Sequence, residues 1–142
     1  MKTLQQLSLF LENKPAALAA PVQALADAGV NIYTLSVADT QSFGVLRLLV
    51  RDAPSAQKVL AAKGFASVLT DVVAVQVEDT PGQLAKILAV LATHDVNVEY
   101  MYAFAGFRAG QAALVFRFRD PADALAKIGG ELALLDEADL FA

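Results

Sequence analysis

The chain contains no cysteine. This absence excludes disulfide bonds, thiolate nucleophiles and sulfur ligands for a metal, and it fits a reducing compartment. Histidine occurs only once, at position 94, so no second histidine stands at metal-ligand spacing. Because one imidazole makes neither a catalytic triad nor a metal site, we expect His94 to have a surface or packing role. We therefore expect no metal and no other cofactor.

Positive charge and long apolar segments are also scarce. Lysine and arginine number 11 against 15 acidic residues, which gives a net charge of −4 and leaves no basic field for nucleic acid or an anionic membrane. The longest uncharged stretch, residues 15–26, contains two prolines and is shorter than the roughly 20 apolar residues of a membrane helix. Residues 1–8 alternate apolar and polar side chains, unlike a signal peptide. We expect a soluble cytoplasmic protein.

No arrangement of residues typical of an enzyme is recognisable. A catalytic site of this size would need a nucleophile with its base, a pair of tuned carboxylates or a metal cluster. Charged residues at strand ends, such as Glu12, Glu78 and Asp79, are usually only solvated. The arginines of the later strands are expected to lie on an exposed sheet face for the same reason; these are Arg47, Arg51, Arg117 and Arg119. We expect the protein not to be an enzyme.

The sequence repeats itself. Residues 12–31 align with residues 78–97 at a constant offset of 66, with eight identities in twenty positions, and Arg51-Asp52 recurs as Arg119-Asp120 at an offset of 68. The two extra residues of the second copy are placed in a hairpin turn around residues 106–110. With 56% hydrophobic residues each half can bury a core, although a half of this size is marginal alone. We predict two domains, 1–70 and 71–142.

Each copy begins with a strand and a helix. The apolar runs 7–11 and 73–77 predict first strands, and Pro15 and Pro81 stand where a helix can begin. Thr80 and Gln83 have the spacing of a capping box. Gly29 is a typical C-terminal stop. Pro21 conflicts with a helix that starts at Pro15, so we expect either a kink or a later start.

Each copy continues with a hairpin, a second helix and a last strand. The hairpins combine residues 32–38 with 45–51 and residues 98–105 with 112–119. Asp52 and Asp120 cap second helices that end at Gly64 and Gly129. The last strands are expected at 66–70 and 132–135. The order βαββαβ predicts an α+β, ferredoxin-like fold in both copies, which by itself says little about function.

The loop between the first strand and the first helix is the feature with most chemical promise. Backbone N–H groups after the proline, at residues 16–17 and 82–83, can receive a carboxylate at a helix N-terminus. Asn13 and Asp79, just before the proline, can accept a hydrogen bond from an ammonium group. The loop could therefore bind both the carboxylate and the ammonium group of a zwitterion. Equally, Asn13 and Asp79 could merely organise the turn, as such residues usually do.

Two motifs in each copy resemble the ACT domain. They are (Asn/Asp)-x-Pro-(Gly/Ala)-x-Leu at the first helix and (Gly/Asp)-Val-Asn-(Ile/Val) before the second strand. The resemblance covers essentially the whole chain, and residues 35–40 and 43–44 are similar to stand-alone tandem ACT proteins without a catalytic domain. It implies two ferredoxin-like domains that pair through their second strands into a continuous antiparallel sheet with helices on one face.

The resemblance also implies where a free amino acid would bind. One site would combine the first loop with the second asparagine motif: Asn13, Lys14, Ala16, Ala17, Asn97 and Val98. The other would combine Asp79, Thr80, Gly82, Gln83, Leu84, Asn31 and Ile32. We favour the second site, because Gly82 lets a ligand approach the backbone more closely than Ala16 does.

In function, the resemblance implies a regulatory protein that binds a free amino acid between its domains, forms a homodimer and acts on another, unknown protein. The alternative is a protein-interaction or dimerisation module without a ligand.

Overall fold

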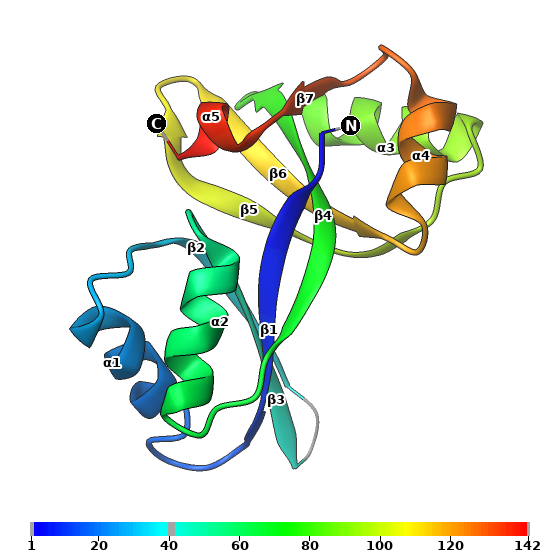
Figure 1. The fold of residues 1–142 in the computed structure, drawn as a ribbon. Coiled ribbons are helices and arrows are strands. Elements are labelled where there is room, and N and C mark those ends of the chain that lie inside the picture. The colour runs from blue at the N-terminus through cyan, green and yellow to red at the C-terminus, as the bar shows by residue number, and fades with distance from the viewer. Residues whose placement is uncertain (1, 40–41, 142) are drawn as a thin grey trace. The chain divides into compact units, whose positions relative to one another are not determined.

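The computed structural model describes residues 2–39 and 42–141, and the side chains of all of these except 105 and 106. The chain forms two compact units (Figure 1). We call Gln5–Thr70 the first domain and the rest of the chain, which includes Leu4 and the residues from Asp71 onward, the second domain. The boundary between Thr70 and Asp71 falls inside a single strand, β4 (Val68–Glu78).

The first domain has the predicted element order. It contains β1 (Leu4–Glu12) apart from Leu4, α1 (Ala19–Asp27), β2 (Ile32–Asp39), β3 (Phe43–Val50), α2 (Ala53–Ala62) and the start of β4. Strand β3 lies between β1 and β2 and pairs antiparallel with both, so that Leu48 stands opposite Leu7 and Leu35. Thr40, part of the predicted motif 35–40, lies outside the described residues.

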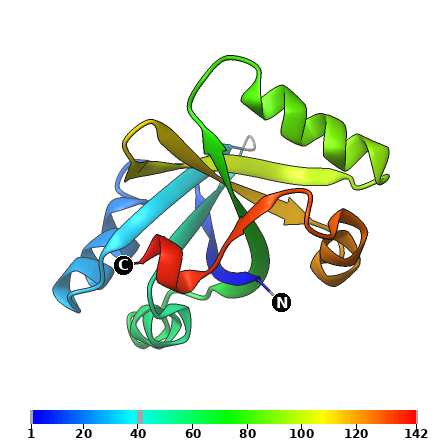
Figure 2. The same ribbon diagram turned by 90° about the horizontal axis from the view of Figure 1, so that it is seen from above.

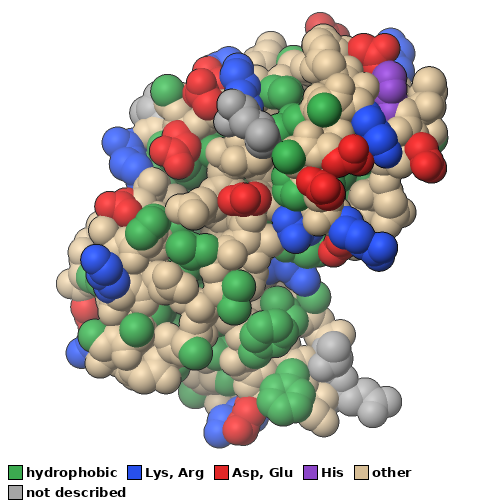
Figure 3. Space-filling model, turned by 45° about the vertical axis from the view of Figure 1, so that its right-hand side comes forward, with side chains coloured by type: hydrophobic (Ala, Val, Ile, Leu, Met, Phe, Trp, Pro, Cys, Tyr) green, Lys and Arg blue, Asp and Glu red, His purple; other side chains and the backbone are tan. Residues whose placement is uncertain are grey.

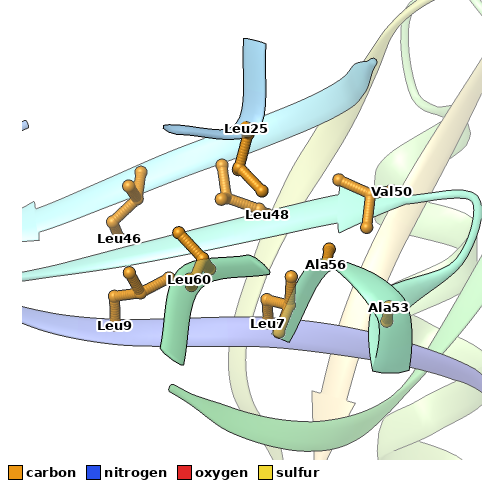
Figure 4. Packing of buried hydrophobic residues seen from close by; sticks show 9 residues of the cluster. All are labelled: Leu7, Leu9, Leu25, Leu46, Leu48, Val50, Ala53, Ala56 and Leu60. Atoms are coloured by element: carbon orange, nitrogen blue, oxygen red, sulfur yellow. The ribbon is translucent and has the colours of Figure 1, made fainter. Parts of the chain in front are cut away.

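The core of the first domain lies between this sheet and its two helices (Figure 4). Side chains two residues apart in a strand point to the same face, and β1 and β3 use this spacing to bury leucine and valine against α1 and α2. The buried residues are Leu7, Leu9, Leu25, Leu46, Leu48, Val50, Ala53, Ala56 and Leu60. The alternation of apolar residues in the sequence therefore identifies the inner face of the sheet.

The second domain repeats this order. The remainder of β4 is followed by α3 (Gln83–Thr93), β5 (Val98–Arg108), β6 (Gln111–Phe118), α4 (Pro121–Ile128), β7 (Ala133–Leu135) and a short α5 (Glu137–Leu140). Strand β6 pairs with β4 and β5, and β7 pairs with β4, all antiparallel. Helices α3 and α4, separate in Figure 2, supply core residues against this sheet. The predicted α+β class and the βαββαβ order of both copies are confirmed.

The two extra residues of the second copy lie in strand β5 rather than in a longer turn. The register of β5 against β6 changes by two residues between the pair Phe104 and Ala113 and the pair Arg108 and Gln111. The turn itself consists of Ala109 and Gly110, and Gly110 has a positive φ of 73°. The insertion is thus accommodated as an irregularity of the strand.

The first helices begin later than predicted. Helix α1 starts at Ala19 and α3 at Gln83, because Ala16 and Gly82 have left-handed φ angles of 68° and 87°, which a helix cannot contain. Gly82 is the N-cap residue of α3, so the capping box predicted for Thr80 and Gln83 is wrong. The late start makes Pro21 the third residue of α1, where a backbone N–H would have no helical acceptor. Of the two outcomes expected for Pro21, the late start is the one observed.

The other predicted helix boundaries are present. Asp52 and Asp120 each cap a helix by accepting a backbone N–H three residues later at 3.1 Å. Helix α1 ends in a Schellman motif, in which Val30 N–H donates to Leu25 O at 2.9 Å and Gly29 has a φ of 74°. Helix α3 ends in the same motif, in which the N–H of Val96 donates to the carbonyl of Leu91 at 2.9 Å and Asp95 takes the position of Gly29.

The left-handed residues of the two loops give a matched stability prediction. An alanine in the left-handed conformation is strained by its Cβ atom. A Cβ atom added at Gly82 would meet no neighbouring atom, so the only cost of alanine there is the backbone strain of the left-handed φ. We expect Ala16→Gly to raise the free energy of unfolding, and Gly82→Ala to lower it, by about 0.5–1 kcal/mol each. Urea unfolding followed by circular dichroism measures both; changes of the same sign would contradict the assignment.

Candidate functional site

Two backbone hydrogen bonds of the loop before α1 recur in the loop before α3. Asn13 N–H donates to the carbonyl of Ser42, and Asp79 N–H donates to the carbonyl of Gly110, both at 3.0 Å. In the first loop the N–H of Ala17 donates to the carbonyl of Lys14 at 3.3 Å. In the second loop the N–H of Gln83 donates to the carbonyl of Thr80 at 3.4 Å. The repeat therefore preserves the path of the backbone even though most side chains of the loop differ.

The side chains of the first loop are engaged locally. Asn13 Nδ2 donates to Asp39 Oδ1 at 3.1 Å, which ties the loop to the end of β2. Lys14 Nζ forms an ion pair with Glu12 at 3.1 Å. For Asn13 these contacts support the simpler reading, in which the residue organises the turn. In the second loop, among the described residues, no hydrogen bond or ion pair engages the carboxylate of Asp79.

One backbone donor in each loop has no hydrogen-bond acceptor among the described residues. Among the hydrogen bonds of the described residues, none is donated by the N–H groups of Ala16 or Gly82. Both residues are exposed. The sequence predicts free N–H groups at residues 16–17 and 82–83, and this holds only in part, because the N–H groups of Ala17 and Gln83 donate to the carbonyls of Lys14 and Thr80. Only the second loop has an unengaged carboxylate beside its remaining donor.

The asparagines of the second motif lie elsewhere in each domain. Asn31 and Ile32 follow the C-terminal end of α1, whereas the loop 13–17 precedes its N-terminal end. The nine residues of α1 separate them by roughly 13 Å along the helix axis. Asn97 and Val98 stand in the same relation to α3. No single domain brings its loop and its asparagine together, and the combinations that the resemblance implies stay predictions.

Asn31 lines a pocket of about 300 Å³ in the first domain. Strand pairing places Ile32 opposite Val50, so Arg51 and Asp52 at the end of β3 come next to Asn31. The lining residues are Gly29, Val30, Asn31, Tyr33, Arg51, Asp52 and Ser55. The sequence analysis missed this pocket, although the recurrence of Arg-Asp in both copies was a signal for it.

The second domain has a pocket at the equivalent place, of about 390 Å³. It is lined by Asp95, Val96, Asn97, Phe118, Arg119, Asp120, Asp123 and Ala124. Valine, asparagine, arginine and aspartate are therefore present in both pockets at positions related by the repeat. The pockets differ in charge, because Asp95 and Asp123 replace Gly29 and Ser55.

The arginines of the two pockets have different partners. Arg51 Nη2 donates to the hydroxyl of Tyr33 at 3.1 Å, whereas Arg119 Nε lies 3.7 Å from the carboxylate of Glu99, the residue at the position of Tyr33. Asp52 accepts from the Ser55 hydroxyl at 2.8 Å and from the Ser55 N–H at 3.1 Å. These bonds, the hydroxyl bond foremost, lower the pKa of Asp52 and keep its carboxylate ionised.

His94 takes the structural role expected of it. It is the C-cap residue of α3. Its side chain is 28% exposed, and its Nε2 atom pairs with the carboxylate of Glu131. The described residues include no group of three or more side chains that could hold a metal ion. None of the helices described is long and apolar enough to cross a membrane.

Comparison with known proteins identifies the family. The family model of the ACT domain pair matches residues 2–141. A solved protein from Bacteroides thetaiotaomicron is 36% identical with a TM-score of 0.89, over 98% of this chain and 96% of that one. The regulatory subunit of aspartate kinase from Thermus thermophilus shares the fold, with 20% identity, a TM-score of 0.61 and coverage of 90% and 91%. Curated proteins gave no match. The matches indicate no catalytic family, and the chain belongs to the family of ACT domain pairs.

Proposed function

We propose that the chain is a regulatory protein, without catalytic activity, that binds a free amino acid. The observation that carries this proposal is the duplicated loop, in which two backbone hydrogen bonds and a left-handed residue recur while the side chains vary. Every amino acid presents a carboxylate, and backbone N–H groups recognise a carboxylate without regard to side chain. Membership of the ACT domain pairs supports the regulatory role.

The favoured site is the loop before α3. The ligand carboxylate accepts from the N–H groups of Gly82 and Leu84, both near the positive end of the helix dipole. The ammonium group donates to the carboxylate of Asp79. The family resemblance adds Asn31 and Ile32 to this site, and Asn97 and Val98 to the weaker one at Asn13. An effect on a separate protein then requires only that the ligand binds two conformations with different affinity.

Thermal melting of the purified protein against a panel of free amino acids tests the proposal. A ligand at 100 times its dissociation constant is expected to stabilise the fold by about 2.7 kcal/mol. Asp79→Ala removes the partner of the ammonium group and should weaken binding about tenfold or more, because a charged hydrogen bond is lost. Asn97→Ala should weaken the other site.

Asp71→Ala is the matched control, since it removes an equal charge from an exposed position of β4 outside the loop. It should leave the dissociation constant unchanged. Unchanged affinity in both Asp79→Ala and Asn97→Ala would overturn the assignment of the sites.

A second candidate function, a protein-interaction module, is favoured by exposed hydrophobic residues in the first domain. Phe10 is 68% and Phe43 53% exposed, and the strand register places both on the sheet face opposite the core. The equivalent positions of the second domain hold Gln76 and Gln111. Hydrophobic side chains gather on the lower half of the surface in Figure 3. Such exposure typically marks an interface, here a homodimer. Absence of any thermal shift with amino acids at millimolar concentration would favour this function.

A further inference from the structure

We propose that a groove beside the loop of the second domain takes the side chain of the bound amino acid and selects an amide, as in glutamine. This β4–α3 groove has a volume of about 460 Å³ and is lined by residues of β4, of α3 and of the segment 131–133. Lys86 donates to the amide oxygen, and the carboxylate of Glu78 accepts from the amide N–H. The inference rests on the proposed function, because the carboxylate and ammonium groups of the ligand bind at the loop.

The β4–α3 groove adjoins the proposed ligand loop. Glu78 and Gln83 both line it, and they are the residues immediately before Asp79 and immediately after Gly82. In Figure 2 the loop between them leaves the end of β4 and turns back into α3. A ligand held by the loop therefore has the groove within reach of its side chain. The volume of the groove lies within the range of small-molecule pockets.

The position of Lys86 sets the length of the side chain that fits. The Lys86 N–H donates to the carbonyl of Gly82 at 3.1 Å, so Lys86 stands one helical turn, roughly 5 Å along the axis, beyond the loop. The Cα–Cβ bonds of a helix tilt toward its N-terminus, which directs the start of the Lys86 side chain back toward the loop. The amide carbon of glutamine is three bonds from its α-carbon and suits this separation better than the shorter side chain of asparagine.

Lys86 and Glu78 carry opposite charges and are not engaged elsewhere. Among the hydrogen bonds and ion pairs of the described residues, none involves the Lys86 ammonium group or the Glu78 carboxylate. The third charged residue of the lining, Glu131, is paired with His94. An amide has an acceptor, a donor and no net charge, so it matches this pair. The carboxylate of a glutamate ligand would be repelled by Glu78.

The inner part of the groove is apolar and contacts the methylene groups of the ligand. Its lining includes the buried side chains of Val75 and Ile87 and the half-buried side chains of Val77, Val90 and Leu132. Burial of methylene groups against these side chains is favourable for any aliphatic chain of this length. The pair of charged residues, rather than the apolar wall, therefore sets the preference for an amide.

The first domain lacks this pair. At positions related by the offset of 66, Lys86 corresponds to Ala20, which has no polar group. Glu12, the counterpart of Glu78, forms its ion pair with Lys14 at 3.1 Å. We therefore expect one amide-selective site per chain, in the second domain.

Isothermal titration calorimetry on the full chain tests the inference. The probes are L-glutamine, L-asparagine, L-glutamate and L-norleucine, whose side chain has a similar length and no polar group. Glutamine is expected to bind about tenfold more tightly than each of the others, because only glutamine satisfies both charged groups. Lys86→Met keeps the length of the side chain without its charge. It should weaken glutamine binding about tenfold and leave norleucine binding within about twofold of the parent.

Two further variants are matched to Lys86→Met. Glu78→Gln removes the charge that repels glutamate and should bring the affinities for glutamate and glutamine to within about threefold of each other. Lys63→Met removes an equal charge from an exposed position of the first domain and should leave the dissociation constant for glutamine within about twofold of the parent. Circular dichroism melting of each variant without ligand checks that the fold is retained.

The outcomes distinguish this inference from the proposed function. If an amino acid binds but glutamine binds no more tightly than norleucine, the role of the β4–α3 groove is wrong and the proposed function stands. The same holds if Lys86→Met binds glutamine as tightly as the parent does. Equal losses in Lys86→Met and Lys63→Met would show a general effect of charge and would overturn the role of Lys86. If no free amino acid binds the parent protein in either calorimetry or melting, the proposed function fails together with this inference.

Discussion

Phe116→Ala is expected to lower the free energy of unfolding of the second domain by about 3–5 kcal/mol. The side chain lies in the middle of β6, is 0% exposed, and stacks on Phe118 with ring centroids 5.7 Å apart. The substitution removes the buried ring and leaves a cavity between the sheet and its helices. The loss of stacking adds to the loss of buried area. Urea unfolding followed by circular dichroism measures the change.

Two substitutions serve as references for Phe116→Ala. Leu48→Ala removes the residue at the equivalent position of the first domain, also 0% exposed, and is expected to cost about 2–5 kcal/mol. Phe10→Ala removes an aromatic ring that is 68% exposed and should change stability by about 0.5 kcal/mol or less. A cost below about 1 kcal/mol for Phe116→Ala would mean that its surroundings are not packed as described.

Elements with a local signal could be predicted from the sequence. The apolar alternation of β1 and β3 identified the core face. The aspartates Asp52 and Asp120, each followed closely by a proline, identified the starts of α2 and α4, because an N-cap side chain bonds within its own turn. The short α5, capped by Asp136 and Asp139, had a similar local signal and was missed. Strand β4 was predicted as two strands, yet it passes through Asp71 without a break.

The start of α1 could not be read from the sequence because it depends on the sign of one dihedral angle. Ala16 is the residue whose left-handed φ prevents the helix from starting earlier. Alanine normally favours a helix, so its type gives no sign of this. Its counterpart Gly82 is the better indicator, since glycine adopts a left-handed φ without strain. Comparing the two copies position by position would have revealed the late start of both helices.

The two parts of the candidate site differed in how far they could be predicted. The loop at Asp79–Gln83 is continuous in sequence, so the Gly82 donor and the Asp79 carboxylate could be identified directly, whereas the Gln83 N–H, also expected to be free, donates to Thr80. The pocket at Asn31 also includes Arg51, twenty residues later in the chain, and the two residues meet only through the pairing of β2 with β3. An exposed arginine at a strand end has solvent as its default surroundings. The neighbours of Arg51 could therefore be identified only from the register of β2 against β3.

Ile87→Pro is expected to unfold the second domain under conditions in which the parent protein is folded. Ile87 is the counterpart of Pro21, but α3 begins at Gln83, so Ile87 is the fifth residue of its helix and its N–H donates to a helical carbonyl. Proline there removes this bond and clashes with the preceding turn. The side chain is also only 5% exposed and belongs to the core.

Ile87→Ala separates the backbone effect from the loss of the side chain. It keeps the N–H and should cost about 2–5 kcal/mol through truncation alone, so proline should cost about 3 kcal/mol more than alanine at this position. Pro21→Ala, in contrast, restores an N–H that has no helical acceptor and should cost about 1 kcal/mol or less, because only buried apolar area is lost. Differential scanning calorimetry of the three variants measures these costs. Equal melting of Ile87→Pro and Ile87→Ala would contradict the start of α3 at Gln83.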